Sequence, residues 1–382
     1  MFDQFTAIIR NTFFESIRQP IVLVILLVAT LMVVLGGSWA AFTMEDDQHM
    51  LINLGMSTVF VSGALLAGFV ATGVLAREIE NKTALTVVSK PVPRPIFVLG
   101  KYFGVAGAML ICSLYLTFVF LLVERHGVLQ TVRDPLHGPV IVFGVGAIVI
   151  ALIASVWCNY FYNRVFASTM ICFAAPLVAA AYLLSLMFQH DFQTVPLDAS
   201  VTPAVLNIWK AMFTMMTAIL VMTAIAIAAS ARLGQVMTIV VTMGVFMLGL
   251  LSDWLFGRPL AKLRETWLNR AILEGQTHTV ESVTEIALVN GETRTSTTST
   301  DVLNDGVALS SFTEGAEPLL SGLYQVASSI VPNFQRLWLS DAVTQEHTIP
   351  ASYVTGATTY GLIYVVVALA AAVFLFQPRE VG

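Results

Sequence analysis

The chain has 382 residues, of which 57% are hydrophobic and only 11% charged, and its formal net charge at pH 7 is −5. A typical soluble domain carries about 25% charged residues, so this composition excludes an ordinary soluble fold. The acidic balance and the sequence pI of about 5.7 also exclude the strongly basic character of nucleic-acid-binding domains.

The first segment, residues 2–18, is predicted to be a helix lying in the membrane interface. Its apolar residues recur at three- and four-residue spacing and form one stripe: Phe2, Phe5, Ile9, Phe13 and Ile17. Polar residues, among them Asp3, Arg10 and Glu15, fall largely on the other side. Such a helix lies among the lipid headgroups until Pro20 turns the chain inward. A frayed cytoplasmic tail is the alternative.

Eight apolar segments are long enough to cross a bilayer, which needs about 20 residues per helix. They cover residues 20–42, 51–76, 102–123, 139–161, 165–187, 211–230, 236–256 and 356–376. Two of the links between them, 162–164 and 231–235, are so short that one pair could instead be a re-entrant hairpin. The expected fold class is therefore an all-α polytopic membrane protein with about eight transmembrane helices, and at least six.

The distribution of Lys and Arg predicts a cytoplasmic N-terminus, because short cytoplasmic loops carry the excess of positive charge. In this orientation ten basic residues lie inside: Arg10, Arg18, Arg77, Lys82, Lys90, Arg94, Lys101, Arg164, Arg232 and Arg379. Three lie outside: Arg125, Arg133 and Lys210. Four more, Arg258, Lys262, Arg264 and Arg270, follow the seventh segment on the expected outer side. They belong to a long loop, and long loops translocate largely regardless of charge.

Residues 77–101 form a dense polar insert between the second and third apolar segments. Seven charged residues lie here: Arg77, Glu78, Glu80, Lys82, Lys90, Arg94 and Lys101. Three prolines, Pro91, Pro93 and Pro95, lie among them. A compact charged loop at the cytoplasmic surface indicates a docking element for a soluble partner, and an ordinary positive-inside loop is the alternative.

Residues 257–355 are expected to form an external α+β region before the last transmembrane helix. The pattern predicts a helix over 263–273 and a strand over 283–289 that enters a hairpin turn at Asn290-Gly291. An apolar helical stripe precedes Pro332 and contains Leu319, Leu320, Leu323, Val326 and Ile330. Packing on the membrane face and packing on a second subunit both remain open for this stripe. The expected division is a membrane domain over 1–256, the external region over 257–355, and a last helix with a cytoplasmic tail over 356–382.

The sequence carries no motif for catalysis or metal binding. It contains no G-x-x-x-x-G-K-[ST], H-E-x-x-H, C-x-x-C or G-x-S-x-G. Asp253 is the only acidic residue within the apolar segments, and its place beside Trp254 favours a role at the outer interface. The six histidines fall in expected external loops without tight ligand spacing, and the three cysteines read as small buried residues.

The stretch from Glu78 to Gly104 resembles the loop between the second and third helices of type-2 ABC exporter permeases. Glu78 and Glu80 supply the acidic start of that motif and Thr83 its threonine. Ser89-Lys90-Pro91-Val92-Pro93-Arg94 matches the Ser-x-Pro-Val-x-Arg element, and Gly100-Lys101 closes it. Lys82 stands where many members have Gly. Typical members also have six helices, which is fewer than the eight segments here.

The resemblance implies the permease subunit of an ATP-driven exporter in the inner (cytoplasmic) membrane. It implies a coupling helix over 80–90 that docks on a separate ABC ATPase subunit, with a second permease chain completing the assembly. The docking residues would be Glu78, Glu80, Lys82, Thr83, Ser89, Pro91, Arg94 and Lys101. ATP and Mg would bind to the partner subunit, so the resemblance implies no catalytic or cofactor site in this chain.

Two other function classes remain open. One is a secondary transporter or channel, although such proteins usually keep ionisable residues at mid-membrane. The other is a membrane-anchored assembly or sensor protein whose external region binds a partner.

Overall fold

The computed structural model describes residues 2–40, 47–76, 93–128, 136–196, 200–287, 293–304 and 307–376. The N-terminal half contains α1 (Phe2–Ile17), α2 (Pro20–Ala40), α3 (Asp47–Ala71), the π-turn η1 (Thr72–Ala76), α6 (Arg94–His126), α7 (Gly138–Tyr162) and α8 (Phe166–Ser185). The C-terminal half begins with α10 (Pro203–Ser230), α11 (Gln235–Ser252), the π-turn η2 (Asp253–Gly257) and α12 (Arg258–Leu273). It continues with β1 (Thr277–Ala287), β2 (Thr293–Leu303), η3 (Leu309–Phe312), α13 (Glu317–Ile330), η4 (Phe334–Arg336), α14 (Ser340–Thr344) and α15 (Ala351–Phe376).

Eight helices in the described parts of the chain are long and apolar enough to cross a membrane, one for each predicted segment. The chain is therefore an all-α polytopic membrane protein, and the predicted fold class is confirmed. α2 and α7 expose large apolar side chains such as Leu27, Val142 and Ile153. Since these residues would be costly in water, the surface that they form faces lipid.

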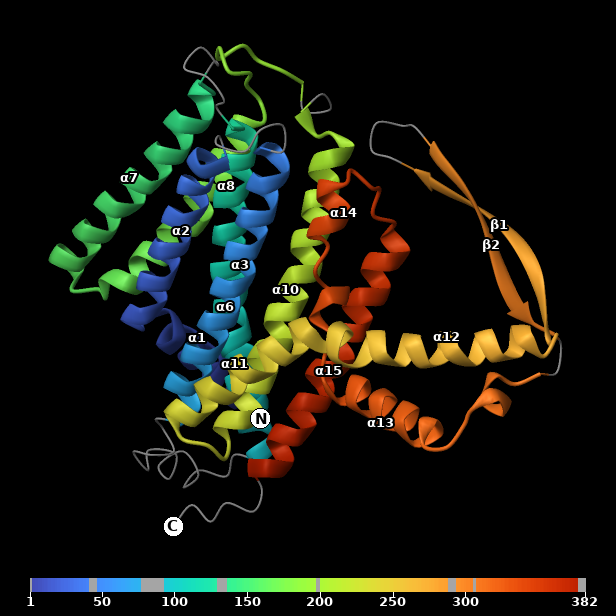
Figure 1. Cartoon of the computed structure of the whole chain (residues 1–382). Coiled ribbons are helices and arrows are strands. Elements are labelled where there is room, and N and C mark those ends of the chain that lie inside the picture. The colour runs from blue at the N-terminus through green and yellow to red at the C-terminus, as the bar shows by residue number, and fades with distance from the viewer. Residues whose placement is uncertain are drawn as a thin grey trace.

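The centre of the bundle is α6, which packs against α1, α2, α3, α7, α8, α10 and α15 (Figure 1). The three most buried spans are α3, α6 and α10. Small residues let these helices approach closely: a side-chain carbon at Gly55 would overlap Phe120 of α6, and one at Gly63 would overlap Ile219 of α10. This is the mode of packing expected in lipid, where the hydrophobic effect does not drive helices together.

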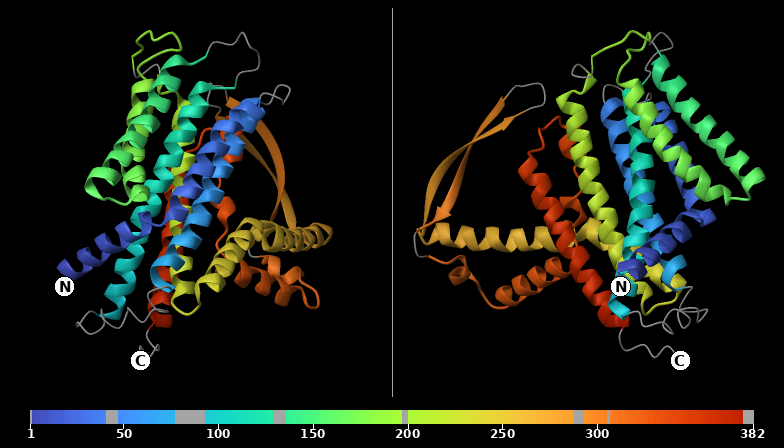
Figure 2. Two further views of the ribbon diagram at one scale, coloured as in Figure 1. Left: turned by 90° about the vertical axis from the view of Figure 1, so that its left-hand side faces the viewer. Right: turned by 180° about the vertical axis from the view of Figure 1, so that it is seen from behind.

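The predicted interfacial helix is present as α1, which lies across the direction of the spans (Figure 2). Its buried face is formed by Thr12, Ser16 and Ile17, whereas Phe2 is largely exposed. α1 is thus seated on α6 by its C-terminal half. The start of α6 and the end of α15 meet here, where Phe97 stacks on Phe376 at 5.8 Å between ring centroids. We call this end of the molecule the α1 end.

The seventh span does not stop where the sequence predicted. α11, η2 and α12 form one helical stretch over 235–273, and the π-turn η2 lies where its direction changes. Figures 1 and 2 show α12 running crosswise at about the level of α1, so the basic residues of α12 lie toward the same end as α1. α11 packs on the part of α3 nearer this end, with Gly68 beside Met243.

The chain returns through the bundle after α13. In residues 331–349 Phe334, Leu337 and Val343 are buried in the main core, and the Phe334 ring lies 6.0 Å from that of Phe60 in α3. The segment is held at its far end by Asn207, whose side-chain amide donates to the carbonyl oxygen of His347 at 3.0 Å. Residues 257–355, expected to form one external region, are therefore divided. Their last part, residues 331–349, packs beside α3 within the bundle.

The remaining part of that region is a small unit with its own core. β1 and β2 form the predicted hairpin, antiparallel with Thr277 opposite Leu303 and Ala287 opposite Thr293. Its turn, 288–292, lies outside the described residues. A second apolar cluster joins Trp267 and Ala271 of α12 to Phe312. The apolar stripe of α13 lies on the surface of the protein, where Leu319, Leu323 and Ile330 are 58–71% exposed.

Replacing the buried Phe334 tests whether residues 331–349 belong to the bundle. Phe334→Ala should lower the free energy of unfolding by about 3 kcal/mol or more, because it empties a site packed by Phe60 and Phe246. Unfolding by SDS in mixed micelles measures the change. Phe374→Ala is the matched control, since that ring on α15 is 69% exposed. Equal losses in the two variants would contradict the placement.

Candidate functional site at the α1 end

The polar insert leaves the bundle at the α1 end, between η1 and α6. Its first part, 77–92, lies outside the described residues and includes six of the expected docking residues: Glu78, Glu80, Lys82, Thr83, Ser89 and Pro91. Arg94 and Lys101 are described, and both lie in the first turns of α6. The structure therefore shows what anchors the insert at its two ends.

The downstream anchor is a rigid helix start. Pro93 occupies the N-cap with φ −59° and ψ 133°, and Pro95 follows within the first turn. Proline suits these positions because its fixed φ matches the helix and its missing N–H has no helical partner there. Arg94 is exposed at the first position of α6.

Lys101 has a different environment from Arg94. Its ammonium group lies 3.5 Å from a carboxylate oxygen of Glu15 in α1, and its side chain is 3% exposed. The same group lies 5.7 Å from the centre of the Phe97 ring. A buried ammonium in this position joins α1 to α6. Direct contact of Lys101 with a soluble subunit would require α1 to move away.

Close backbone approach also joins α1 to α6. A side-chain carbon at Gly104 would lie 2.8 Å from the carbonyl oxygen of Ile9, and one at Gly100 would lie 2.7 Å from Ile8. Both positions therefore require glycine as long as α1 stays in place. The Gly100-Lys101 pair of the sequence motif thus supplies one small residue and one charge to the same helix contact.

The upstream anchor is η1, which contacts α1, α10 and α11. A side-chain carbon at Gly73 would lie 2.7 Å from the amide group of Gln19, in the link between α1 and α2. The insert is thus tied on one side to α3 through η1 and on the other side to α6. α1 contacts both anchors. A force applied to the insert would reach all three helices.

Charged groups are rare inside the described part of the bundle. Of the residues that are less than 9% exposed there, Asp47 and Lys101 alone are charged, and each lies toward the end of its helix. Asp253 is half-buried in the π-turn η2. The described residues therefore contain no chain of buried ionisable groups across the membrane, which is what a proton or ion relay requires.

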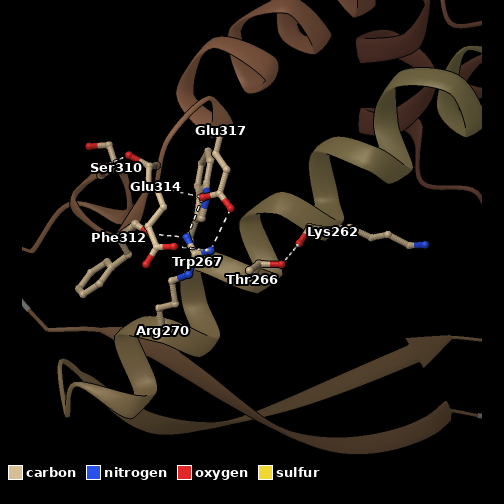
Figure 3. A network of polar contacts seen from close by, with 9 residues as sticks. Lys262, Thr266, Trp267, Arg270, Ser310, Phe312, Glu314 and Glu317 are labelled. Atoms are coloured by element: carbon tan, nitrogen blue, oxygen red, sulfur yellow. Dashed lines mark hydrogen bonds and ion pairs between the residues drawn. The ribbon is translucent and has the colours of Figure 1, made fainter.

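A polar network braces α12 against α13 (Figure 3). The guanidinium of Arg270 donates to both carboxylate oxygens of Glu317, at 2.7 and 2.9 Å. The indole N–H of Trp267 donates to the same carboxylate at 2.8 Å. These donors lower the pKa of Glu317 to about 2, chiefly through the Arg270 hydrogen bonds and secondarily through the backbone N–H of Glu314. The paired geometry holds the two helices together at the end away from the bundle.

A cleft of about 1090 Å³ lies at the other end of this helix pair, between η2, α12, α13 and α15. Its lining combines aliphatic side chains of α15, such as Ile363 and Val367, with two arginines, Arg264 and Arg336. No local sequence pattern marks this site, because its walls come from segments more than a hundred residues apart.

No metal site is formed by the described residues, in which no three His, Cys, Asp or Glu side chains gather. The three cysteines are free, and only Cys112 is fully buried, whereas Cys172 is exposed on the bundle surface. The expectation that all three are buried is therefore wrong for Cys172, which lies in the apolar helix α8. On a lipid-facing helix an exposed small residue is still in an apolar environment.

Comparison with known proteins gives no relative: no family model, no curated protein and no solved structure matches this chain.

The contact between α1 and α6 can be tested with one methyl group. Gly104→Ala should cost about 1–3 kcal/mol of unfolding free energy, because the new carbon meets the Ile9 carbonyl oxygen and Thr12. Gly146→Ala in α7 is the matched control, since nothing lies within 4 Å of the new carbon there. Unfolding in mixed micelles compares the two. A loss of stability at Gly146 as large as that at Gly104 would count against the close contact.

The hydrogen bonds between Arg270 and Glu317, which join α12 to α13, should be lost at low pH. The pKa of Glu317 is lowered from 4.5 to about 2, so the stability it contributes is present above pH 4.5 and is lost as the pH falls toward 2. Glu317→Gln should therefore speed hydrogen exchange of backbone amides in α13 severalfold at neutral pH. The difference from the parent protein, measured at the same pH, should disappear between pH 4.5 and 2.

Glu265→Gln is the control for this experiment, because Glu265 is an exposed carboxylate on the same helix α12 as Arg270. A change of similar size in that variant would assign the effect to general charge loss.

Proposed function

We propose that this chain is the transmembrane permease subunit of an ATP-driven ABC exporter and works with a separate ATPase subunit. The observation that carries the proposal is the position of the polar insert, whose two ends are anchored on η1 and on α6 at the α1 end of the bundle. The insert is also the segment that resembles the coupling loop of type-2 exporter permeases.

The anchors make the insert suited to transmitting force. Prolines 93 and 95 fix the start of α6, and the Glu15–Lys101 ion pair with the glycine contacts makes α1 and α6 one packed unit. A push on the insert would move this unit together with α3. In the proposed cycle, ATP binding closes a pair of ATPase subunits, and the insert passes that movement to the spans.

The scarcity of buried charges supports an external energy source. A secondary transporter would need ionisable groups inside the membrane to couple an ion gradient, and among the described residues Asp47 and Lys101 are the fully buried charged ones. We therefore prefer an ATPase-driven permease to a secondary transporter or channel. No ATP site is proposed in this chain, and ATP with Mg is assigned to the partner.

The alternative of a membrane-anchored assembly protein has one observation in its favour. The outward apolar stripe of α13, with Leu323 and Val326 each 58% exposed, offers a surface for another protein chain. In the ABC proposal the same stripe is available to a second permease chain. The two readings differ in whether an ATP-binding subunit accompanies the protein.

Reversing the charges at Glu80 and Lys82 tests the docking role. The protein is purified from its native membrane in mild detergent, and co-purifying chains are photolabelled with azido-ATP. We expect a labelled chain with the parent protein and about tenfold less with the Glu80→Lys, Lys82→Glu variant, because reversing charges in an interface opposes docking. Glu265→Lys with Lys262→Glu, on the exposed face of α12, is the matched control and should retain the labelled chain.

Two results would contradict the proposal. One is the absence of any ATP-labelled chain from the parent preparation. The other is reaction of Ser89→Cys with a membrane-impermeant maleimide in intact cells, because a docking loop for a cytosolic ATPase must face the cytosol. Reaction only after the cells are permeabilised is the expected outcome.

A further inference from the structure

The cleft between η2, α12, α13 and α15 combines two kinds of surface. Its wall is aliphatic and includes Val245 of α11 with Ile363, Val367 and Ala371 of α15. Its charged lining residues are Arg264 of α12, Arg336 of η4 and one acidic residue, Asp253. The volume of about 1090 Å³ lies at the upper end of the range for small-molecule binding sites.

The neutral polar groups of the cleft are largely used by the protein itself. The hydroxyl of Tyr364 donates to the carbonyl oxygen of Ser329 at 2.7 Å, and the backbone N–H of Asn333 donates to the hydroxyl oxygen of Tyr360 at 2.8 Å. These bonds fix the walls of the cleft and join α15 to the chain after α13.

Unlike these neutral groups, the two arginines of the cleft form no ion pair within the described part of the protein. Both are exposed, and no carboxylate in the described residues lies within 4.0 Å of either guanidinium, Asp253 included. The guanidinium of Arg336 lies 5.3 Å from the centre of the Tyr360 ring, which holds it at the cleft while leaving its N–H groups available. The lining of the cleft contains these two guanidinium groups and one carboxylate, that of Asp253, so its net charge is positive.

The aliphatic wall is continuous with the lipid-facing surface of α15. Ile363 and Val367 line the cleft, and they are also 58% and 61% exposed, beside Leu362 and Val366. A hydrocarbon chain could therefore lie along α15 and enter the cleft from the side of the bundle without crossing water. Arginine recognises phosphate and carboxylate groups by paired hydrogen bonds, so the polar side of the cleft favours an anionic group.

We propose that this cleft binds an anionic amphiphile, with its acidic headgroup on Arg264 and Arg336 and an acyl chain against Ile363 and Val367. The site requires no ATPase subunit, so it goes beyond the proposed function and can be tested on the chain alone.

Native mass spectrometry of the full chain in detergent tests the proposal with palmitoyl-oleoyl phosphatidylglycerol as probe. The parent protein should bind this lipid at least about tenfold more tightly than the phosphatidylcholine of the same chains, because the choline ammonium of the latter cancels the phosphate charge that attracts the two guanidinium groups. Arg264→Gln with Arg336→Gln should remove this preference. Retention of the full preference by the double variant would overturn the proposal.

Lys262→Gln is the matched control, because it removes one positive charge from the same helix at a residue outside the cleft lining. Figure 3 shows the Lys262 side chain extending away from the polar network of α12. This variant should keep the preference for phosphatidylglycerol. Loss of the preference in Lys262→Gln would assign binding to the general charge of α12 and would also overturn the site.

Two further arms separate an amphiphile from a soluble anion. Glycerol 3-phosphate, which carries the phosphate without acyl chains, should not displace the lipid at equal concentration. Val367→Trp keeps both arginines but fills the aliphatic wall, and it should weaken phosphatidylglycerol binding to the level of the double variant. Displacement by glycerol 3-phosphate, or unchanged binding in Val367→Trp, would contradict the acyl-chain part of the proposal.

Discussion

Close packing of helices through small residues is the constraint on which this structure depends. In lipid the apolar side chains gain little by meeting one another, so helices associate where their surfaces fit at short distance. Because Gly55 and Gly63 of α3 lack side chains, Phe120 and Ile219 can pack directly against their backbone. The backbone of α1 approaches Gly104 of α6 in the same way. These contacts place α3, α6 and α10 at the centre and leave α2 and α7 facing lipid.

The same constraint explains how non-helical chain enters the bundle. Irregular backbone is tolerated at membrane depth only where protein surrounds it. Residues 331–349 meet this condition because Phe334 fits against Gly249 of α11 and packs on Phe60 of α3, while side chains of α10 bind the carbonyl oxygens of His347 and Ile349. The bend at η2 directs α12 away from α3, and residues 331–349 pack beside α3 in its place.

The α1 end and the cleft connect through this arrangement. α11 contacts η1, one anchor of the polar insert, and continues through η2 into α12, which lines the cleft. α15 lines the cleft with Ile363 and Val367 and ends beside Phe97 in α6, near the other anchor. Under our proposals, movement of the insert would alter the helices that form the lipid-binding cleft, because both anchors contact elements that continue to it.

The sequence alone determined the eight apolar helices, the hairpin and the membrane class of this protein, because apolar runs of membrane length and the Asn290-Gly291 turn signal are local properties of the chain. All eight predicted segments became helices, and the hairpin formed at the expected place. Only the tertiary structure decided that Lys101 meets Glu15, 86 residues away, that Phe334 belongs to the main core, and that Arg264 and Arg336 share a cleft. These pairings depend on the direction in which helices leave a bend and on which small residues allow close approach. Neither the direction nor the sites of close approach can be predicted from a local pattern of residue types.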